Sequence, residues 1–270
     1  MKKAEAERAG SVMPQRPAHF VFVHGFGLGA WCWYKVRTLL ESSGYTVSCI
    51  DLKSAGTDGT DANSIVSFHD YNMPLTDFML SLPENERVIL VGHSAGGLSL
   101  TQAMRGFAGK IRVAVFVAAT MLRLGFYTDQ DVKDGVLDLS VYGDVHVLGF
   151  RKGYDKYPTS ILIKKEFQRS IMYQMSPQED STLASMLMKP GPMLALQNAR
   201  FNDYFARDMD MVPRVYIKSV HDNVLKREQQ ESMIRRWPPA ETYTIESDHC
   251  PFFSAPLVLC GLLVMISSSY

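Results

Sequence analysis

The stretch from residue 87 to residue 107 constrains the fold of this 270-residue chain more than any other. An apolar run at 87–91 leads directly into a G-x-S-x-G motif at 92–96, and a run of helical character follows. This motif between a strand and a helix predicts a sharp turn that lifts the hydroxyl of Ser94 clear of the backbone. The motif alone is weak, since about one chain in ten of this length would contain it by chance. Its context makes Ser94 a candidate nucleophile rather than an idle serine in a glycine-rich turn.

Strands and helices alternate on both sides of this motif. The predicted strands are continuous apolar runs, as a parallel sheet covered on both faces requires. We expect strands at 19–24, 45–50, 87–91, 113–118, 214–219 and 241–246, and helices at 30–41, 70–82, 95–107, 226–236 and 256–266. The pattern predicts an α/β fold in which a mainly parallel sheet is flanked by helices.

The alternation stops for about 85 residues after Thr120, which predicts an inserted helical cap. Within it, residues 161–174 and 178–188 have helical character. The expected organisation is a disordered N-terminal tail at 1–17, a core at 18–120 and 206–270, and a cap or lid at 121–205.

Charge and composition exclude several classes of protein. Lys plus Arg number 28, as do Asp plus Glu, so the basic excess of a nucleic-acid-binding protein is absent. The 46% of hydrophobic residues exclude a disordered chain. The longest apolar stretch, at 257–266, is too short to cross a membrane. These features predict a globular protein whose ligand is a small molecule.

The cysteines and the first residues of the chain allow predictions about the cellular compartment and about cofactors. The four cysteines, at 32, 49, 250 and 260, form no CxxC pair and no spacing typical of a metal site. The charged first residues lack the apolar segment of a signal peptide. We expect a cytoplasmic protein with no metal and no cofactor, with no nucleic-acid or membrane partner, and with a homodimer as the base expectation.

A serine nucleophile needs a base and an acid, and both are found after predicted strands. His249 follows the strand at 241–246, and Asp222 follows the strand at 214–219. Catalytic groups of open α/β sheets collect at the carboxyl ends of the strands. The chain order Ser94, Asp222, His249 is that of α/β hydrolases. The alternative for His249 is a buried structural histidine.

Other candidates fit these two roles less well. Asp248 adjoins His249, but sequence neighbours rarely face each other, so we assign it a structural role. Asp51 ends the second strand and is a weaker rival. His93 is expected to point away from the partner of Ser94. The remaining histidines are at 19, 24, 69, 146 and 221; of these, His146 and His69 have no sheet context and His221 has no derivable role.

The tetrahedral intermediate of acyl transfer needs two backbone donors. One is predicted to be the N–H of Ala95, directly after the nucleophile at a helix N-terminus. The other is predicted to be the N–H of Phe26, in the HGFG run after the first strand. A dinucleotide-binding loop is the alternative for this run, but Ala30 breaks the G-x-G-x-x-G pattern.

The segments HFVFVHGFGLGAWCWYKV, VSCIDLKSAGTD and VILVGHSAGGLSL resemble the plant methylesterase family, which is related to the hydroxynitrile lyases. The resemblance runs from about residue 19 to residue 266 and implies catalytic roles for Ser94, Asp222 and His249. The segments KDGVLDLS, GDVHVLGF, IRRWPPAETY and ESDHCPFFSAP are most similar to the methyl indole-3-acetate esterase branch. The methyl salicylate branch usually ends D-H-M-A-M, whereas His249 here is followed by Cys-Pro-Phe-Phe.

The resemblance also helps to decide between lyase and esterase activity. Hydroxynitrile lyases of this kind carry a threonine at the position of Gly25 and a lysine at the position of Cys250. Without that lysine no cation stabilises a departing cyanide, so the residues favour an esterase.

The expected function is hydrolysis of methyl esters of small plant hormone acids, with methyl indole-3-acetate as first choice. Ser94 attacks the ester, His249 takes its proton and Asp222 orients His249. We expect Gly25, Phe26, His93 and Met121 to contact a substrate held under the cap. The alternatives are a hormone receptor of this fold with slow turnover and a generic carboxylesterase. Receptors of this fold tend to carry Val-Ser after the nucleophile, where this chain has Ala-Gly-Gly.

Overall fold

The computed structural model describes residues 17–151, 153, 157–202 and 208–270. All but the last residue of the expected disordered tail at 1–17 lie outside the described residues. No helix in these ranges is long and apolar enough to span a bilayer.

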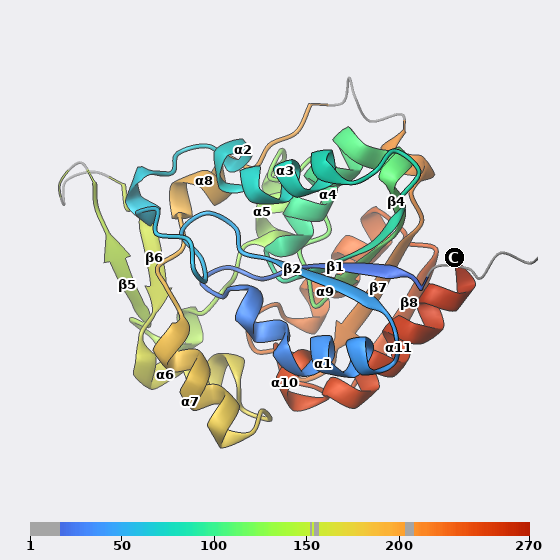
Figure 1. Ribbon diagram of the computed structural model, residues 1–270. Coiled ribbons are helices and arrows are strands. Elements are labelled where there is room, and N and C mark those ends of the chain that lie inside the picture. The colour runs from blue at the N-terminus through green and yellow to red at the C-terminus, as the bar shows by residue number, and fades with distance from the viewer. Residues whose placement is uncertain (1–16, 152, 154–156, 203–207) are drawn as a thin grey trace, which may run out of the picture.

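A parallel sheet forms the centre of the molecule (Figure 1). In the described residues it has six strands in the order β2-β1-β3-β4-β7-β8, and every neighbouring pair is parallel. The strands are β1 (His19–Val23), β2 (Thr46–Ile50), β3 (Val88–His93), β4 (Ile111–Val117), β7 (Arg214–Ser219) and β8 (Glu241–Ile245). The predicted α/β architecture is confirmed.

Helices cover both faces of the sheet, which explains why its inner strands β1, β3 and β4 are almost entirely apolar. In β3, Val88 and Leu90 join one hydrophobic cluster, whereas Ile89 and Val91 join the other. The first cluster includes side chains of α2 (Phe68–Tyr71), α3 (Met73–Ser81), α4 (Gly96–Phe107) and α9 (Arg227–Arg236). The second includes side chains of α1 (Tyr34–Ser42), α10 (Pro251–Ser254) and α11 (Pro256–Ser269).

The single helix expected at 70–82 is two helices in the structure. Asn72 separates α2 from α3 with φ −91° and ψ 2°, and Pro74 lies in the first turn of α3. Proline has no backbone N–H to continue a helix, but it is tolerated in a first turn. The prediction missed this boundary because the apolar spacing continues across it.

The insertion between β4 and β7 contains strands as well as helices. Its described elements are α5 (Asp129–Gly135), β5 (His146–Gly149), β6 (Ser160–Ile163), α6 (Lys165–Met172), α7 (Gln178–Leu187) and α8 (Met193–Gln197). Strands β5 and β6 pair antiparallel, so the helix predicted to start at residue 161 starts at Lys165 instead. The hairpin lies with α6 and α7 at one side of the sheet (Figure 1).

The cap is fastened to the core by partly buried polar contacts and by buried apolar ones. Tyr34 Oη donates to Asp180 Oδ1 at 2.6 Å, and Lys35 forms an ion pair with the same carboxylate. Ile171 and Tyr173 of the cap belong to the hydrophobic cluster of α1 and α10. Part of the cap therefore shares one core with the sheet.

Helix α4 packs directly onto the end of β1. Substitutions at two glycines of the helix test how close this packing is. A Cβ at Gly96 would lie 2.6 Å from the carbonyl oxygen of His24, whereas a Cβ at Gly106 in the same helix meets nothing within 4 Å. We expect Gly96→Ala to lower the free energy of unfolding by about 1–3 kcal/mol, because α4 must move off β1.

The matched variant Gly106→Ala is expected to leave the free energy unchanged or to raise it by up to about 1 kcal/mol. Urea denaturation of the two variants measures the difference. Equal destabilisation by both would contradict the close packing of α4 on β1.

Candidate active site

The turn between β3 and α4 holds Ser94 in an uncommon backbone conformation. Its φ is +52°, in the left-handed region that residues other than glycine rarely adopt. Two backbone hydrogen bonds fix the turn: Ser94 N donates to Val117 O at 3.3 Å, and Thr120 N donates to Ser94 O at 2.9 Å. This is the strained strand-to-helix turn that presents a nucleophile at the carboxyl edge of a sheet.

A buried hydrogen bond joins His249 to Asp222. His249 Nδ1 lies 2.8 Å from Asp222 Oδ2, and neither side chain is more than 1% exposed. The other carboxylate oxygen accepts from the backbone N–H groups of Val224 and Leu225 at 2.8 and 2.9 Å. Because the carboxylate accepts, Nδ1 carries the proton and Nε2 is left to act as a base.

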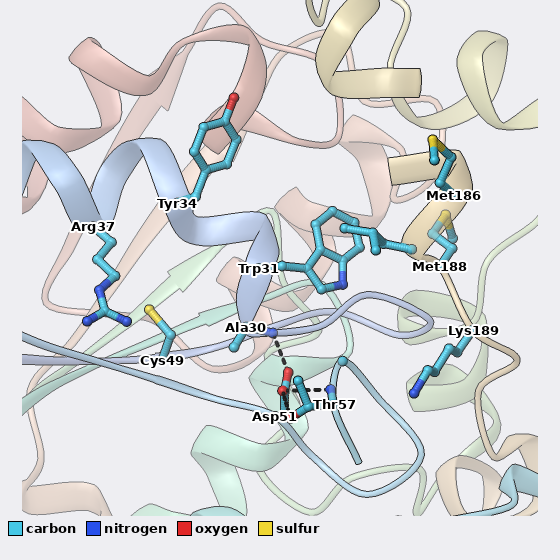
Figure 2. Close-up of a pocket in the computed structure, with 12 residues that line it drawn as sticks. Ala30, Trp31, Tyr34, Arg37, Cys49, Asp51, Thr57, Met186, Met188 and Lys189 are labelled. Atoms are coloured by element: carbon cyan, nitrogen blue, oxygen red, sulfur yellow. Dashed lines mark hydrogen bonds between the residues drawn. The ribbon is translucent and has the colours of Figure 1, made fainter. Parts of the chain in front are cut away.

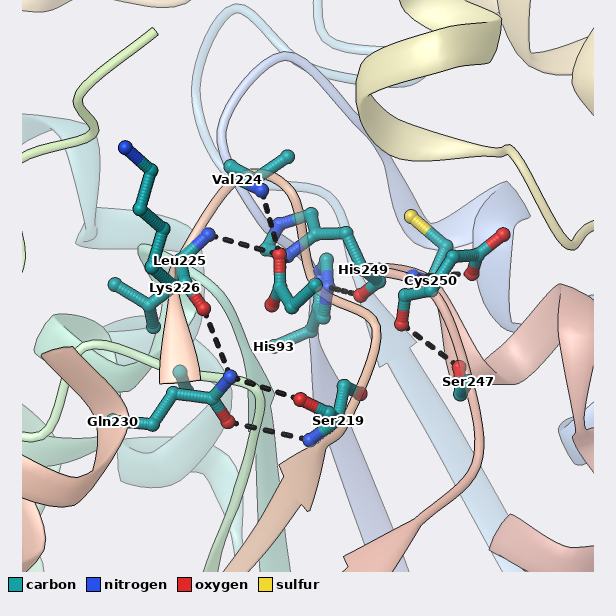
Figure 3. Close-up of polar contacts among 12 residues, drawn as sticks. His93, Ser219, Val224, Leu225, Lys226, Gln230, Ser247, His249 and Cys250 are labelled. Carbon is teal, nitrogen blue, oxygen red and sulfur yellow. Dashed lines mark hydrogen bonds and ion pairs between the residues drawn. The ribbon is translucent and has the colours of Figure 1, made fainter. Parts of the chain in front are cut away.

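A buried amide braces the loop that carries Asp222 (Figure 3). Gln230 of α9 accepts from Ser219 N at 3.2 Å and donates to Ser219 O at 3.1 Å and to Leu225 O at 2.8 Å. The residues before and after Asp222 are thus tied to one side chain. Sequence reasoning missed Gln230, because nothing in its spacing sets it apart from the other polar residues of the helix.

His93 lies against His249 and not away from it, so that expectation was wrong. His93 Nε2 donates to the carbonyl oxygen of His249 at 2.8 Å, and the ring centroids are 4.6 Å apart. Burial holds the pKa of His93 well below its ordinary value, so the ring is neutral. A neutral ring supports the backbone of His249 and would not repel a positive charge on the neighbouring imidazole.

Asp248 links the cap to the loop of His249. Its Oδ2 accepts from Met175 N at 3.0 Å and Ser176 Oγ at 2.8 Å, both in the cap. Its Oδ1 accepts from Cys250 N and Ser254 Oγ, each at 2.9 Å. The structure therefore places Asp248 away from the Nδ1 of His249, in the structural role expected for it.

A pocket with apolar walls opens onto Ser94 and His249. Ser94 and His249 line it together with Gly25, His93 and His146. Its apolar walls are Phe26, Leu28, Leu137, Ile161, Leu162, Ile163, Met172, Met188 and Val224. Catalytic hydrogen bonds often tighten only when substrate binds, and this shared pocket is where Ser94 and His249 can approach each other.

Met121 does not line this pocket, so the expected substrate contact is not found. Its side chain is fully buried in the hydrophobic cluster of α3, α4 and α9, and its N–H donates to Met233 Sδ at 3.3 Å. The chain leaving β4 turns toward α9 at this point rather than under the cap.

The loop expected to supply an oxyanion donor approaches the nucleophile closely. A Cβ at Gly25 would lie 2.8 Å from His93 Nδ1 and 2.9 Å from Ser94 Cβ, so the threonine of the lyases would not fit without movement. Phe26 lines the pocket, and Ala95 immediately precedes the first residue of α4. Burial raises the pKa of the Cys250 thiol well above its ordinary value, so this position carries no charge.

A larger hollow lies outside the catalytic pocket (Figure 2). It measures about 520 Å³, against about 70 Å³ for the catalytic pocket, and no residue of the proposed triad lines it. Asp51 borders this hollow and accepts from Ala30 N at 2.6 Å and Thr57 N at 2.9 Å. The carboxylate of Asp51 is thus committed to the backbone, which excludes it as the partner of His249.

The other histidines serve local contacts. His24 Nδ1 donates to Gly25 O at 2.7 Å and its Nε2 accepts from Leu52 N at 3.1 Å, whereas His221 contacts Glu246 at the surface. In the ranges that the structure describes, no group of three or more His, Cys, Asp or Glu side chains is arranged to hold a metal ion.

Two buried neutral histidines make stability depend on pH. Burial lowers the pKa of both His24 and His93 from 6.5. Below pH 6.5 the unfolded chain binds protons that these native side chains do not, so the free energy of unfolding falls as pH falls. We expect His93→Gln to reduce this slope by about 1 kcal/mol per pH unit between pH 6.5 and 5.5. Urea titrations at several pH values measure it, and identical slopes would contradict the neutral His93.

Asp248→Asn tests the link between cap and core. An amide nitrogen cannot accept hydrogen bonds, so donors on one side of the residue lose their acceptor. We expect the free energy of unfolding to fall by about 1–3 kcal/mol, with a lower kcat because the loop of His249 shifts. Asp144→Asn, at an exposed ion pair of the cap with Lys164, is the matched control and should have no measurable effect. Comparable behaviour of the two variants in urea denaturation would rule out the link.

Comparisons with known proteins agree with this geometry. Residues 20–261 match the model of the alpha/beta hydrolase family. The chain is 52% identical to Methylesterase 17 of Arabidopsis thaliana, covering 100% of this chain and 99% of that protein. It is 41% identical to Methyl jasmonate esterase 1 of Vitis vinifera, covering 96% and 100%. The crystal structure of the methylesterase MES16 from Arabidopsis superposes with a TM-score of 0.83 at 39% identity, covering 94% and 100%. The chain is an ester hydrolase that belongs to the plant methylesterase family of α/β hydrolases.

Proposed function

We propose that this enzyme hydrolyses the methyl esters of small plant hormone acids, with methyl indole-3-acetate as the preferred substrate. The observation that carries the proposal is the convergence of Ser94 and the buried His249–Asp222 pair on a pocket with apolar walls. The pocket offers a nucleophile and a base to an ester whose acyl group is largely apolar.

The residues allow a complete reaction in two steps. Ser94 Oγ attacks the ester carbonyl while His249 Nε2 takes its proton, and the oxyanion is held by the N–H groups of Phe26 and Ala95. The tetrahedral intermediate collapses, and methanol leaves with the proton from His249. Water, deprotonated by His249, then attacks the acyl-enzyme and returns Ser94 with release of the free acid.

The charge of the pocket favours an ester as substrate over its acid. Among the described residues that line the pocket, no Lys, Arg, Asp or Glu is present. An uncharged methyl ester enters such a pocket at little electrostatic cost, whereas a carboxylate without a cationic partner is disfavoured there. Hydrolysis therefore converts a ligand that suits the pocket into one that leaves it.

The choice of acid rests on the segments that resemble the methyl indole-3-acetate branch. One of them, GDVHVLGF, includes strand β5, whose first residue lines the pocket. The relative named for methyl jasmonate is 41% identical, less than the 52% of Methylesterase 17, whose name leaves the acid open. Jasmonate is thus the principal rival for the acid.

Acid release from methyl indole-3-acetate, methyl jasmonate and methyl salicylate tests the proposal. The wild type should hydrolyse methyl indole-3-acetate with the highest kcat/KM, and Ser94→Ala should lose about four orders of magnitude or more in kcat. Ser99→Ala removes a buried hydroxyl of α4 and should remain active. Chromatographic quantification of the free acids gives the ranking.

Two results would count against the proposal. Undiminished acid release by Ser94→Ala would remove the serine mechanism. A wild type that releases none of the three acids would remove these hormone esters as substrates.

A further inference from the structure

The cap supplies one polar side chain to the catalytic pocket. Of the described cap residues that line it, all are apolar except His146. Ser94 and His249 reach this pocket from the core, whereas His146 reaches it from the cap. A polar group on an otherwise apolar wall is the kind of feature that fixes a ligand's orientation and selects its chemistry.

Strand pairing places His146 beside a residue of the pocket wall. It pairs with Ile163 of β6, and Leu148 pairs with Ile161. Directly paired residues lie on the same face of an antiparallel sheet, and so do residues two apart along a strand. His146 is therefore a direct neighbour of Ile163, and both residues line the pocket together with Ile161 and Leu162.

The charged neighbours of His146 are occupied with each other. Lys164 Nζ contacts Asp144 Oδ2 at 2.7 Å and the Asp144 carbonyl at 2.9 Å. Burial is the main cause that lowers the pKa of His146, with Lys164 adding to it and Asp144 opposing it. The ring is neutral at pH 7 and so has one nitrogen that donates and one that accepts.

We propose that His146 is a specificity-determining residue that accepts a hydrogen bond from a ring N–H of the acyl group. This rests on the proposed function and deepens it: the preferred acid is an apolar aromatic body with one N–H group, as in indole-3-acetate. A pocket with a single polar group on its cap wall discriminates against an acid that leaves that group unpaired.

Two esters that differ in one atom test this role. Methyl benzofuran-3-acetate has an oxygen where methyl indole-3-acetate has N–H, so it lacks the donor while keeping the shape. With the wild type, kcat/KM should be about five- to tenfold higher for the indole ester. In His146→Phe this preference should disappear, mainly through a higher KM for the indole ester, because the bond is present before the chemical step.

Two further variants distinguish a role of His146 in substrate recognition from a role in the structure of the cap. Val147 is the next residue of β5, is 52% exposed and does not line the pocket, so Val147→Phe should keep the preference. His146→Gln retains an acceptor and should restore part of it. If His146→Phe lowers kcat/KM equally for both esters, or leaves the preference intact, the role is overturned. If the wild type hydrolyses neither ester, the proposed function itself fails, and the two failures are thereby distinguishable.

Discussion

The hydrogen bond between His249 and Asp222 lies away from water, and its burial sets the requirements that the surrounding structure meets. A buried carboxylate without partners would be strongly destabilising. Both oxygens of Asp222 are engaged, one by the imidazole and the other by two backbone N–H groups of its own loop. The amide of Gln230 donates to the carbonyl oxygen of Leu225 and so holds one of these two donor residues, and His93 donates to the carbonyl oxygen of His249. The chemistry thus depends on loops that are fixed before any substrate arrives.

The cap forms one wall of the pocket, and it is held to the core by buried carboxylates that accept hydrogen bonds. Asp180 and Asp248 are buried carboxylates that each accept hydrogen bonds across the boundary between insertion and core. Asp248 is next to His249 in the chain and also accepts a hydrogen bond from the cap. The cap wall and the loop of His249 are therefore held by the same residue. Residues of the cap wall can then change, and with them substrate selectivity, while Asp248 keeps the cap and the loop of His249 in the same relative position.

The central sheet could be predicted because its inner strands β1, β3 and β4 are buried on both faces and read as nearly continuous apolar runs, between which the remaining strands and the helices alternate. The same architecture brings the carboxyl ends of β3, β7 and β8 to one edge, which is why Ser94, Asp222 and His249 could be named from their places in the chain. In the structure Ser94 and His249 line one pocket, and Asp222 is joined to His249 by a hydrogen bond.

The hairpin of β5 and β6 could not be predicted in this way. Its strands are only four residues long, and apolar runs as short as those at 147–148 and 161–163 fit a helix as well as a strand. The direction of His93 and the position of Met121 were also mispredicted, because both follow from how the chain leaves a strand end and not from periodicity. Gln230 shows the same limit, since a buried polar side chain looks like a surface one until its partners are known.

The left-handed backbone at Ser94 limits which amino acids could serve as nucleophile in this fold. At positive φ a side chain branched at Cβ is a genuine outlier, whereas an unbranched one is tolerated. Serine and cysteine have the same single substituent on Cβ, but threonine adds a methyl group there. The turn could therefore present a thiol as readily as a hydroxyl, while a threonine hydrolase is closed to this scaffold before any question of proton transfer arises.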